Sequence, residues 1–226
     1  MKFAVLLHGS GVYDGTEIQE AVLTLLAIAE RGHTYQCVAP DIQQHHVIDH
    51  TNGSEMEETR NVFVESARIA RGEIVKLSDF DASAYDVLMM PGGFGTAKNF
   101  TKWAFEGPNG PINESVKNLI LDFVSAGKPI GALCMSPTTV AKALEGSNYH
   151  STLTVGSTAE GSPYDIAAIS GGVEATGAKS EMKTVREVSV DESNKIVCAP
   201  CYMMNANIVE VKKNIELAMD KILALI

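Results

Sequence analysis

The stretch Lys128-Pro129-Ile130-Gly131-Ala132-Leu133-Cys134-Met135-Ser136-Pro137 decides the fold of this chain. Its apolar first half predicts a buried strand, and Pro137 fits the first turn of a helix, where a missing N–H costs little. Cys134 therefore stands at a sharp strand-to-helix corner, beside the positive end of a helix dipole. Such a corner exposes a thiol and lowers its pKa, which favours the nucleophilic thiolate. The alternative is a buried structural cysteine, since free Cys is among the most buried residue types.

Short apolar runs alternate with helical periodicity along the rest of the chain. We expect further strands over 2–7, 34–39, 86–90, near 153, over 185–190 and over 195–199. We expect helices over 16–31, with Thr16 as the N-cap, and over 61–71, 116–126 and 205–225. This alternation predicts a three-layer α/β sandwich with a mostly parallel sheet. No long linker, repeat or low-complexity tract interrupts it, so we expect one domain over residues 1–226.

Three loops follow the ends of predicted strands. They are the segment from Gly9 to Gly15, the segment Pro91-Gly92-Gly93-Phe94-Gly95, and the Cys134 corner. Ligands of open α/β sheets bind in the crevice beyond the carboxyl ends of the strands. We therefore expect these three loops to meet at one edge of the sheet and to form the site.

The glycines after the 86–90 strand give the backbone the freedom to approach a ligand closely. A cysteine that attacks a carbonyl needs N–H donors aimed at the developing oxyanion. We assign this role to the amides of Gly93 and Met135, with Gly92 beside the substrate. The alternative for the paired glycines is a plain tight turn.

Acidic residues open the first helix, and Glu17 and Glu20 are candidates for a catalytic carboxyl. Acids at this position also stabilise the helix dipole without any further role. A protonated glutamate facing Cys134 would donate a hydrogen bond to the thiolate or relay a proton, and we prefer Glu20 slightly. His150, the only histidine after Cys134, is a candidate base, and its alternative is a solvated loop residue. The loop Ala159-Glu160-Gly161-Ser162-Pro163-Tyr164 is a candidate pocket wall.

The composition restricts partners and compartment. The net charge is −10 and no basic stripe is present, which argues against nucleic acid and against an anionic membrane surface. No apolar run is long enough to span a bilayer. The four cysteines are too few and too uneven for a disulfide scaffold. We expect a reducing compartment, either the cytoplasm or an organelle matrix such as that of mitochondria.

Two other groups have spacings that occur in redox or metal sites. Cys198-Ala199-Pro200-Cys201 has the spacing of a redox pair, but its alternative is a simple exit from the sheet. It has no second cluster to complete a zinc site. His45, His46 and His50 lie in a polar stretch, where a solvated loop is the default interpretation. We expect no metal and no organic cofactor.

Several motifs resemble the ElbB family, also called enhancing lycopene biosynthesis or sigma cross-reacting proteins. They include Gly11-Val12-Tyr13-Asp14-Gly15-Thr16-Glu17-Ile18, Ala67-Arg68-Ile69-Ala70-Arg71-Gly72-Glu73-Ile74 and Pro91-Gly92-Gly93-Phe94-Gly95-Thr96-Ala97-Lys98-Asn99. The resemblance covers nearly the whole chain. That family belongs to the ThiJ/PfpI superfamily, whose fold is similar to class I glutamine amidotransferases. It implies a flavodoxin-like sandwich, a nucleophile at Cys134, an oxyanion site at Gly93 and Met135, and a homodimer.

The resemblance also implies an enzyme: a glutathione-independent and cofactor-independent glyoxalase, a lyase. Such an enzyme converts a small dicarbonyl such as glyoxal to a hydroxy acid through a cysteine hemithioacetal, with Glu17 or Glu20 moving the proton. In other superfamily members the activity has been interpreted as deglycation. Met135 stands where PfpI-type peptidases have histidine, and no His-x-Glu follows Cys134, so we expect neither a peptidase nor a glutaminase. The alternatives are a cysteine redox sensor or stress protein, and a regulator of isoprenoid biosynthesis.

Overall fold

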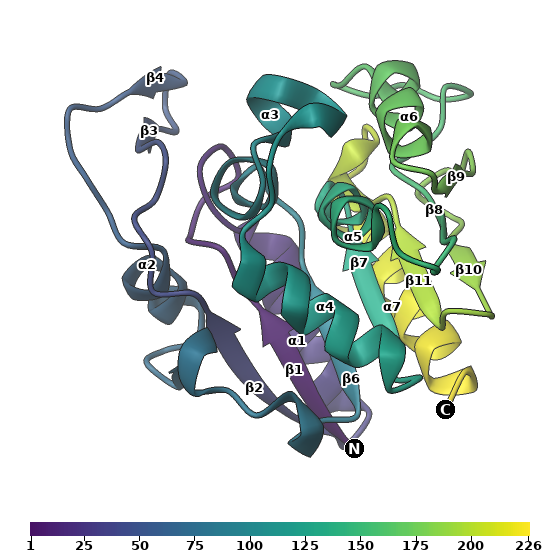
Figure 1. Ribbon diagram of the computed structural model, residues 1–226. Coiled ribbons are helices and arrows are strands. Elements are labelled where there is room, and N and C mark those ends of the chain that lie inside the picture. Colours follow the sequence, from purple (N-terminus) through teal and green to yellow (C-terminus); the bar gives the residue numbers. More distant parts are fainter.

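A central sheet of seven strands organises the molecule, in a computed structural model that describes residues 1–226 (Figure 1). The strands are β1 (Lys2–Leu6), β2 (Thr34–Ala39), β5 (Ile74–Lys76), β6 (Val87–Met90), β7 (Ile130–Leu133), β10 (Ser189–Asp191) and β11 (Ile196–Ala199). Their order is β10-β11-β7-β6-β1-β2-β5, and only β10 runs antiparallel to its neighbour. The prediction of a mostly parallel sheet is confirmed.

Helices cover both faces of this sheet, which gives the predicted three-layer α/β sandwich. They are α1 (Ile18–Glu30), α2 (Val62–Ile69), α3 (Trp103–Glu106), α4 (Glu114–Ser125), α5 (Ser136–Leu144), α6 (Ile166–Ala175) and α7 (Ile208–Ala224). Helices α4 and α5 lie on one face, and α1 and α7 lie on the other (Figure 1). None of the helices combines the length and the apolar character needed to cross a membrane.

Smaller elements lie outside this sandwich. Two-stranded ribbons are formed by β3 (Ile48–Asp49) with β4 (Ser54–Glu55) and by β8 (Thr152–Leu153) with β9 (Lys179–Ser180). Short turns of 3-10 helix span Leu77–Asp79, Ala82–Ala84, Gly107–Asn109 and Cys201–Met203, and a π-helical turn spans Thr96–Phe100. The β3–β4 ribbon extends away from the sandwich beyond the end of β2 (Figure 1).

The core is one cluster of 48 buried residues that runs from Phe3 on β1 to Ile222 on α7. Strands β6, β7 and β11 are buried along their whole length, because helices cover both of their faces. Strands in that position carry continuous apolar runs rather than alternating ones. This is why the sequence signal for these strands is strong.

Some predicted boundaries are wrong. Thr16 does not cap α1: the N-cap is Glu17, whose side chain accepts the amide of Glu20 at 2.6 Å. Thr16 is buried instead, and its hydroxyl accepts the amide of His8 at 2.8 Å. The strand expected over 185–190 begins only at Ser189, and the strand near Leu153 belongs to the β8–β9 ribbon. Helix α6 was not predicted, because its Gly171-Gly172 pair lowers helix propensity.

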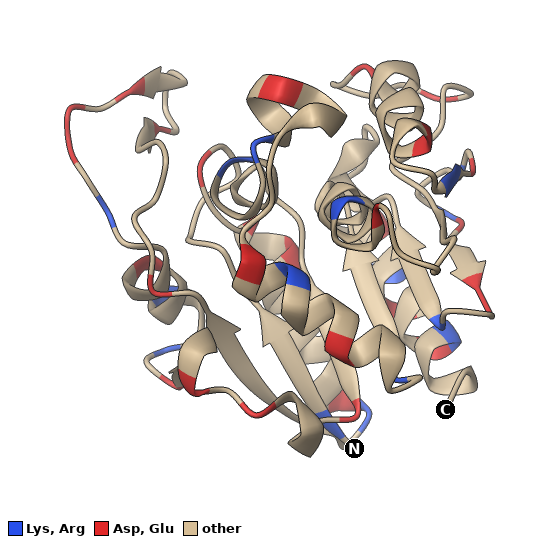
Figure 2. Ribbon diagram, viewed as in Figure 1, with Lys and Arg blue, Asp and Glu red and all other residues tan.

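Strands β1 and β6 lie side by side in the middle of the sheet. From β1 the chain crosses to β2 on one side, and from β6 it crosses to β7 on the other. The strand order therefore reverses between β1 and β6, which opens a crevice at their carboxyl ends. The loops after β1, β6 and β7 meet there. Lys and Arg are scattered over the elements rather than gathered along one of them (Figure 2).

Candidate active site

Cys134 lies at the corner between β7 and α5. Its backbone has φ = +57°, in the left-handed region that a residue with a Cβ rarely adopts. The Cys134 amide donates to the carbonyl of Ala199 at 2.8 Å, which ties the corner to the end of β11. Helix α5 begins two residues later with Pro137 in its first turn, as predicted. The corner thus turns the sulfur out of the sheet and toward the crevice.

The Cys134 thiol is less accessible than the sequence predicts. It is only 5% exposed, and burial, followed by the charge of Glu20, raises its pKa well above the ordinary value. The amides of Gly93 and Met135 act in the opposite direction, because they hydrogen-bond to the sulfur. The predicted lowering of the pKa is therefore wrong: desolvation outweighs the helix dipole. Both amides therefore lie beside the sulfur.

Glu20 faces the sulfur from α1. Its side chain is fully buried, and its Oε2 accepts the amide of Gly92 at 2.9 Å while its Oε1 accepts the amide of Tyr202 at 3.2 Å. It also hydrogen-bonds the side chain of Cys134. Burial, followed by the charge of Glu17, raises the pKa of Glu20 to about 8. A carboxyl tuned in this way can both take and return a proton near neutral pH.

Glu17 lies one turn before Glu20, at the N-cap of α1. It is half-buried, and burial raises its pKa above the ordinary value. Its amide donates to the carbonyl of Gly92 at 2.7 Å, so the start of α1 and the loop after β6 are held together. Gly93 has a φ of +108°, which a residue with a side chain rarely adopts. A side chain at this position would also collide with the backbone of Gly15 and Glu17, so only glycine fits here.

A cavity of about 370 Å³ lies beside Glu17 and is the candidate substrate pocket. Its lining residues are Val12, Tyr13, Glu17, Gln19, Pro163, Tyr164, Tyr202, Met204, Asn205 and Ala206. Pro163 and Tyr164 belong to the loop predicted to shape the pocket. Tyr164 also packs edge-to-face on Phe94, and burial raises its pKa to about 12, so its hydroxyl stays neutral. Glu17 is the one charged residue of this lining, which suits a small neutral substrate.

The loop after β6 is held by two side chains that the sequence did not single out. The carbonyl of Pro91 accepts both the His8 Nε2–H, at 3.2 Å, and the Ser136 hydroxyl, at 2.8 Å. Burial lowers the pKa of His8 to about 4, so the ring is neutral and one nitrogen carries the proton. The signal for both was present, because His8 and Ser136 flank the predicted strand ends.

His150 does not reach this site. It is exposed and follows the carboxyl end of α5, whereas Cys134 precedes the amino end of that helix. The nine residues of α5 make this helix about 13 Å long, and the two residues lie beyond its opposite ends. His150 lines a different cavity, of about 220 Å³, with Tyr149 and Ser151. The structure therefore leaves His150 out of the candidate site.

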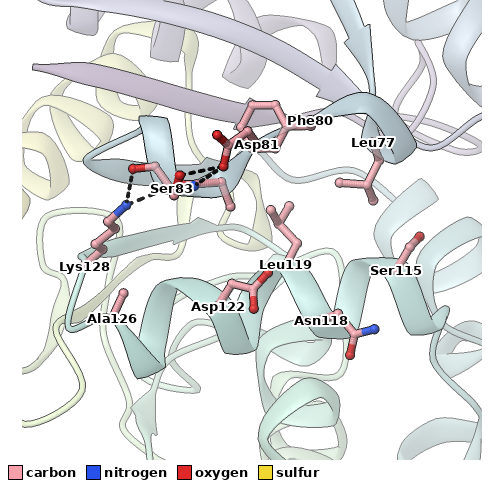
Figure 3. Close-up of a pocket in the computed structure, with 11 residues that line it drawn as sticks. Leu77, Phe80, Asp81, Ser83, Ser115, Asn118, Leu119, Asp122, Ala126 and Lys128 are labelled. Atoms are coloured by element: carbon pink, nitrogen blue, oxygen red, sulfur yellow. Dashed lines mark hydrogen bonds between the residues drawn. The ribbon is translucent and has the colours of Figure 1, made fainter.

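Another cavity, of about 560 Å³, lies between α4 and the 3-10 turn Ala82–Ala84 (Figure 3). It opens at the amino ends of β6 and β7, opposite to the Cys134 corner. Its cation, Lys128, donates to the carbonyls of Ala82 and Ser83 at 3.2 and 3.0 Å. No cysteine or histidine lines it, so we do not assign the chemistry to this cavity.

The histidines of the polar stretch are largely solvated, as the sequence predicts: His45 and His50 are exposed, and His46 is half-buried. The rings of His45 and His46 lie 4.6 and 5.4 Å from that of Phe105, and Lys102 approaches His45 Nδ1 at 3.1 Å. No group of three or more His, Cys, Asp or Glu side chains comes together in a metal-binding arrangement.

The sandwich, the cysteine at a strand-to-helix turn and the glutamate that faces it define a class of α/β proteins. The chain belongs to the DJ-1/PfpI family, whose sequence model matches residues 10–156.

Named relatives extend this similarity over the whole chain. The human protein "Glutamine amidotransferase-like class 1 domain-containing protein 3, mitochondrial" is 41% identical over 99% of this chain and 83% of its own length. The rat "ES1 protein homolog, mitochondrial" is 40% identical over 99% of this chain and 84% of its own length.

Solved structures agree with the fold. An isoprenoid biosynthesis protein with an amidotransferase-like domain, from Ehrlichia chaffeensis, superposes with a TM-score of 0.90 at 32% identity, over 100% of this chain and 99% of that one. Glyoxalase III of Candida albicans superposes with a TM-score of 0.61 at 15% identity, over 99% of this chain and 97% of that one. The second likeness shows the fold alone.

Proposed function

We propose that this protein is a glyoxalase-type enzyme of the ElbB branch of the family. It converts small dicarbonyls such as glyoxal to hydroxy acids such as glycolate, without a metal or an organic cofactor. The observation that carries the proposal is the buried Glu20 carboxyl, hydrogen-bonded to the Cys134 side chain and raised in pKa to about 8. The named activity of the Candida neighbour on the same fold adds support.

In the first step, Glu20 takes the thiol proton while the Cys134 sulfur attacks the aldehyde carbon. A carboxylate with a pKa near 8 is a far stronger base than an ordinary glutamate, so it suits a thiol whose own pKa is raised. The carbonyl oxygen gains the negative charge, and the amides of Gly93 and Met135 stabilise it. Glu20 then protonates this oxygen, which completes the hemithioacetal.

In the second step, a proton moves between adjacent carbons. Glu17 or Glu20 removes the proton from the carbon that bears sulfur, and the electron pair forms an enediol. Return of a proton to the neighbouring carbon leaves a hydroxyacyl thioester on Cys134. Water cleaves the C–S bond, the hydroxy acid leaves, and the thiol regains its proton. Overall, one dicarbonyl and one water give one hydroxy acid.

The test is glycolate production from glyoxal by the wild-type protein and by two variants. Cys134→Ala removes the nucleophile and should lower the rate by on the order of 10³-fold or more. Glu20→Gln keeps the shape but removes the base, and should lower kcat by on the order of 10²-fold or more. Cys198→Ala serves as the matched control, because Cys198 is a buried cysteine on a neighbouring strand end. Equal rates for wild type and Cys134→Ala would end the proposal.

We also propose a homodimer that acts in the cytoplasm or, in a eukaryotic cell, in the mitochondrial matrix. The human and rat relatives carry the word mitochondrial in their names.

The exposed face of α1 is the candidate dimer interface. Three of its apolar side chains share one helix face, which suits contact with a second copy: Ile18, Val22 and Leu26 are 46, 48 and 41% exposed. Light scattering should then give twice the 24.2 kDa of one chain.

A further inference from the structure

Cys201 lies at a second strand-end corner next to that of Cys134. Strands β7 and β11 are parallel neighbours, and Leu133 pairs with Ala199 in their register. Cys134 is therefore one residue beyond the end of β7, and Cys201 is two residues beyond the end of β11. Both residues have left-handed backbones, with φ of +57° and +47°. Two adjacent corners thus each present a thiol at the same edge of the sheet.

The contacts of Cys201 place its sulfur at the candidate active site. Its thiol is fully buried, and the amide of Cys134 hydrogen-bonds to it. The charges of Glu20 and Glu17 also act on this thiol, so it lies on the side of the sheet that α1 covers. The Cys201 amide donates to Oδ1 of Asn214 on α7 at 2.9 Å, and this hydrogen bond holds the Cys201 corner against α7.

Cys198 does not share this environment, although its sequence spacing pairs it with Cys201. The Cys198 thiol contacts the amide of Thr154 and the hydroxyl of Ser189, on β10. Neither Cys201 nor Glu20 acts on it. The interpretation of Cys198 and Cys201 as a redox pair is therefore not supported. The thiol that shares the surroundings of Cys201 is Cys134.

We propose that Cys201 is the resolving thiol of Cys134, and that a hydroperoxide converts the two into a Cys134–Cys201 disulfide. Neighbouring strands lie about 4.8 Å apart, and a disulfide joins Cα atoms separated by about 4.4 to 6.8 Å. The Cys134 amide hydrogen-bonds to the Cys201 sulfur, and both residues lie beyond the paired strand ends, so the two sulfurs can meet without a change in the pairing of the strands.

The chemistry balances with a hydroperoxide as the oxidant. The Cys134 sulfur attacks the terminal peroxide oxygen, the O–O bond breaks, and the released alkoxide takes a proton to become an alcohol. This leaves a sulfenic acid on Cys134. Cys201 attacks that sulfur, the S–O bond breaks, and the hydroxide leaves with the Cys201 proton as water. Two thiols lose two electrons in total, and the hydroperoxide gains them. Glu20, next to both thiols, carries the protons.

The disulfide blocks the nucleophile of the proposed dicarbonyl reaction and protects it from further oxidation to sulfinic acid. A reducing thiol restores it, so the bond is a reversible switch. The inference needs only the sulfur chemistry of Cys134 and holds whether or not glyoxal is a substrate.

The experiment treats the full chain with one equivalent of hydrogen peroxide above pH 8, where Glu20 is ionised. Intact mass and peptide mapping after alkylation then report the fate of the four cysteines, which are all free before treatment. We expect the loss of two hydrogen atoms, with the bond mapped to Cys134 and Cys201. Dithiothreitol should restore both thiols.

Cys201→Ser removes the resolving thiol and should instead gain one oxygen atom on Cys134 for each equivalent of peroxide consumed. Cys198→Ser is the matched control and should form the disulfide as the wild type does. Mapping on the wild-type chain keeps the test valid if a variant fails to fold. A disulfide between Cys198 and Cys201, or sulfinic acid on Cys134 of the wild type with Cys201 still reduced, would overturn the proposal. The mass readout is independent of glycolate production, so the two proposals fail separately.

Discussion

At Gly92, the absence of a side chain is what lets the Cys134 thiol and the Glu20 carboxyl meet. A Cβ there would lie 2.2 Å from the Cβ of Cys134, 2.8 Å from its sulfur and 2.5 Å from Oε2 of Glu20. Those distances are well inside van der Waals contact, so no side chain fits. The Gly92 amide, in turn, holds Oε2 of Glu20 at 2.9 Å. One glycine therefore fixes the relative position of the two groups on which the proposed chemistry depends.

We predict that Gly92→Ala moves Cys134 or Glu20 and lowers kcat for glyoxal by on the order of 10²-fold. The same overpacking should reduce the free energy of unfolding by about 1 to 3 kcal/mol. Gly171→Ala, at an exposed position of α6 with open space around it, is the control and should raise stability by about 0.5 to 1 kcal/mol. Steady-state kinetics and urea titration measure both effects. A fully active Gly92→Ala protein would show that this close packing is not needed.

Helix α5 does more than place Cys134 at its start. Its hydroxyl side chains tie it to the segment that follows β6: Ser136 donates to the carbonyl of Pro91 at 2.8 Å, and the hydroxyls of Thr139 and Thr96 lie 2.7 Å apart. Both contacts are buried, where a lost hydrogen bond costs more than at the surface. The helix and the glycine loop therefore move as one unit, which keeps the amides of Gly93 and Met135 in fixed relation.

We predict that Ser136→Ala loosens this unit and lowers kcat by about 10-fold, the equivalent of one hydrogen bond of about 1.4 kcal/mol. The KM should change little, because Ser136 does not line the substrate cavity. Ser125→Ala is the control, since Ser125 is an exposed serine at the end of α4. A drop in stability for Ser136→Ala with unchanged kcat would mean that the hydroxyl only supports the fold.

For the whole molecule, Glu20 and His8 couple stability to pH in opposite directions. The unfolded chain releases the Glu20 proton near pH 4.5, but the folded protein holds it until about 8. Between those values the folded state binds more protons, so its stability falls as pH rises. His8 is protonated below about 6.5 when unfolded but only below about 4 when folded. It therefore lowers stability as pH falls through that range.

We predict that Glu20→Gln makes the stability curve flatter between pH 4.5 and 8. As pH rises, the free energy of unfolding of the wild type should fall by up to about 1.4 kcal/mol per pH unit relative to the variant. The reason is that the folded wild type binds one more proton than the unfolded chain in this range. Urea titrations across this range measure the difference. Glu57→Gln, at an exposed position, should instead follow the wild-type curve. Parallel curves for wild type and Glu20→Gln would show that Glu20 ionises normally in the folded protein.

The sequence by itself determined the layers, the parallel sheet and the Cys134 corner, because each follows from local periodicity and from residues a few positions apart. It also placed Glu20, Gly92 and Gly93 near one edge of the sheet, because the loops that follow parallel strands all lie at the carboxyl edge of the sheet. The resemblance of its motifs pointed to the superfamily that the comparisons confirm. For the loop that ends in Tyr164, the sequence suggests a place in the pocket wall but does not indicate how it contributes.

Only the tertiary structure decided how these groups are tuned. The amides that hold Glu20 come from Gly92 and Tyr202, 72 and 182 positions away in the chain. Burial by segments so distant sets the pKa of Glu20 and of Cys134, and it reversed the direction predicted for the thiol. The fold also left His150 outside the site and placed Cys201 beside Cys134 rather than with Cys198. Desolvation and long-range contacts sum over the whole packed chain, so no local pattern contains them.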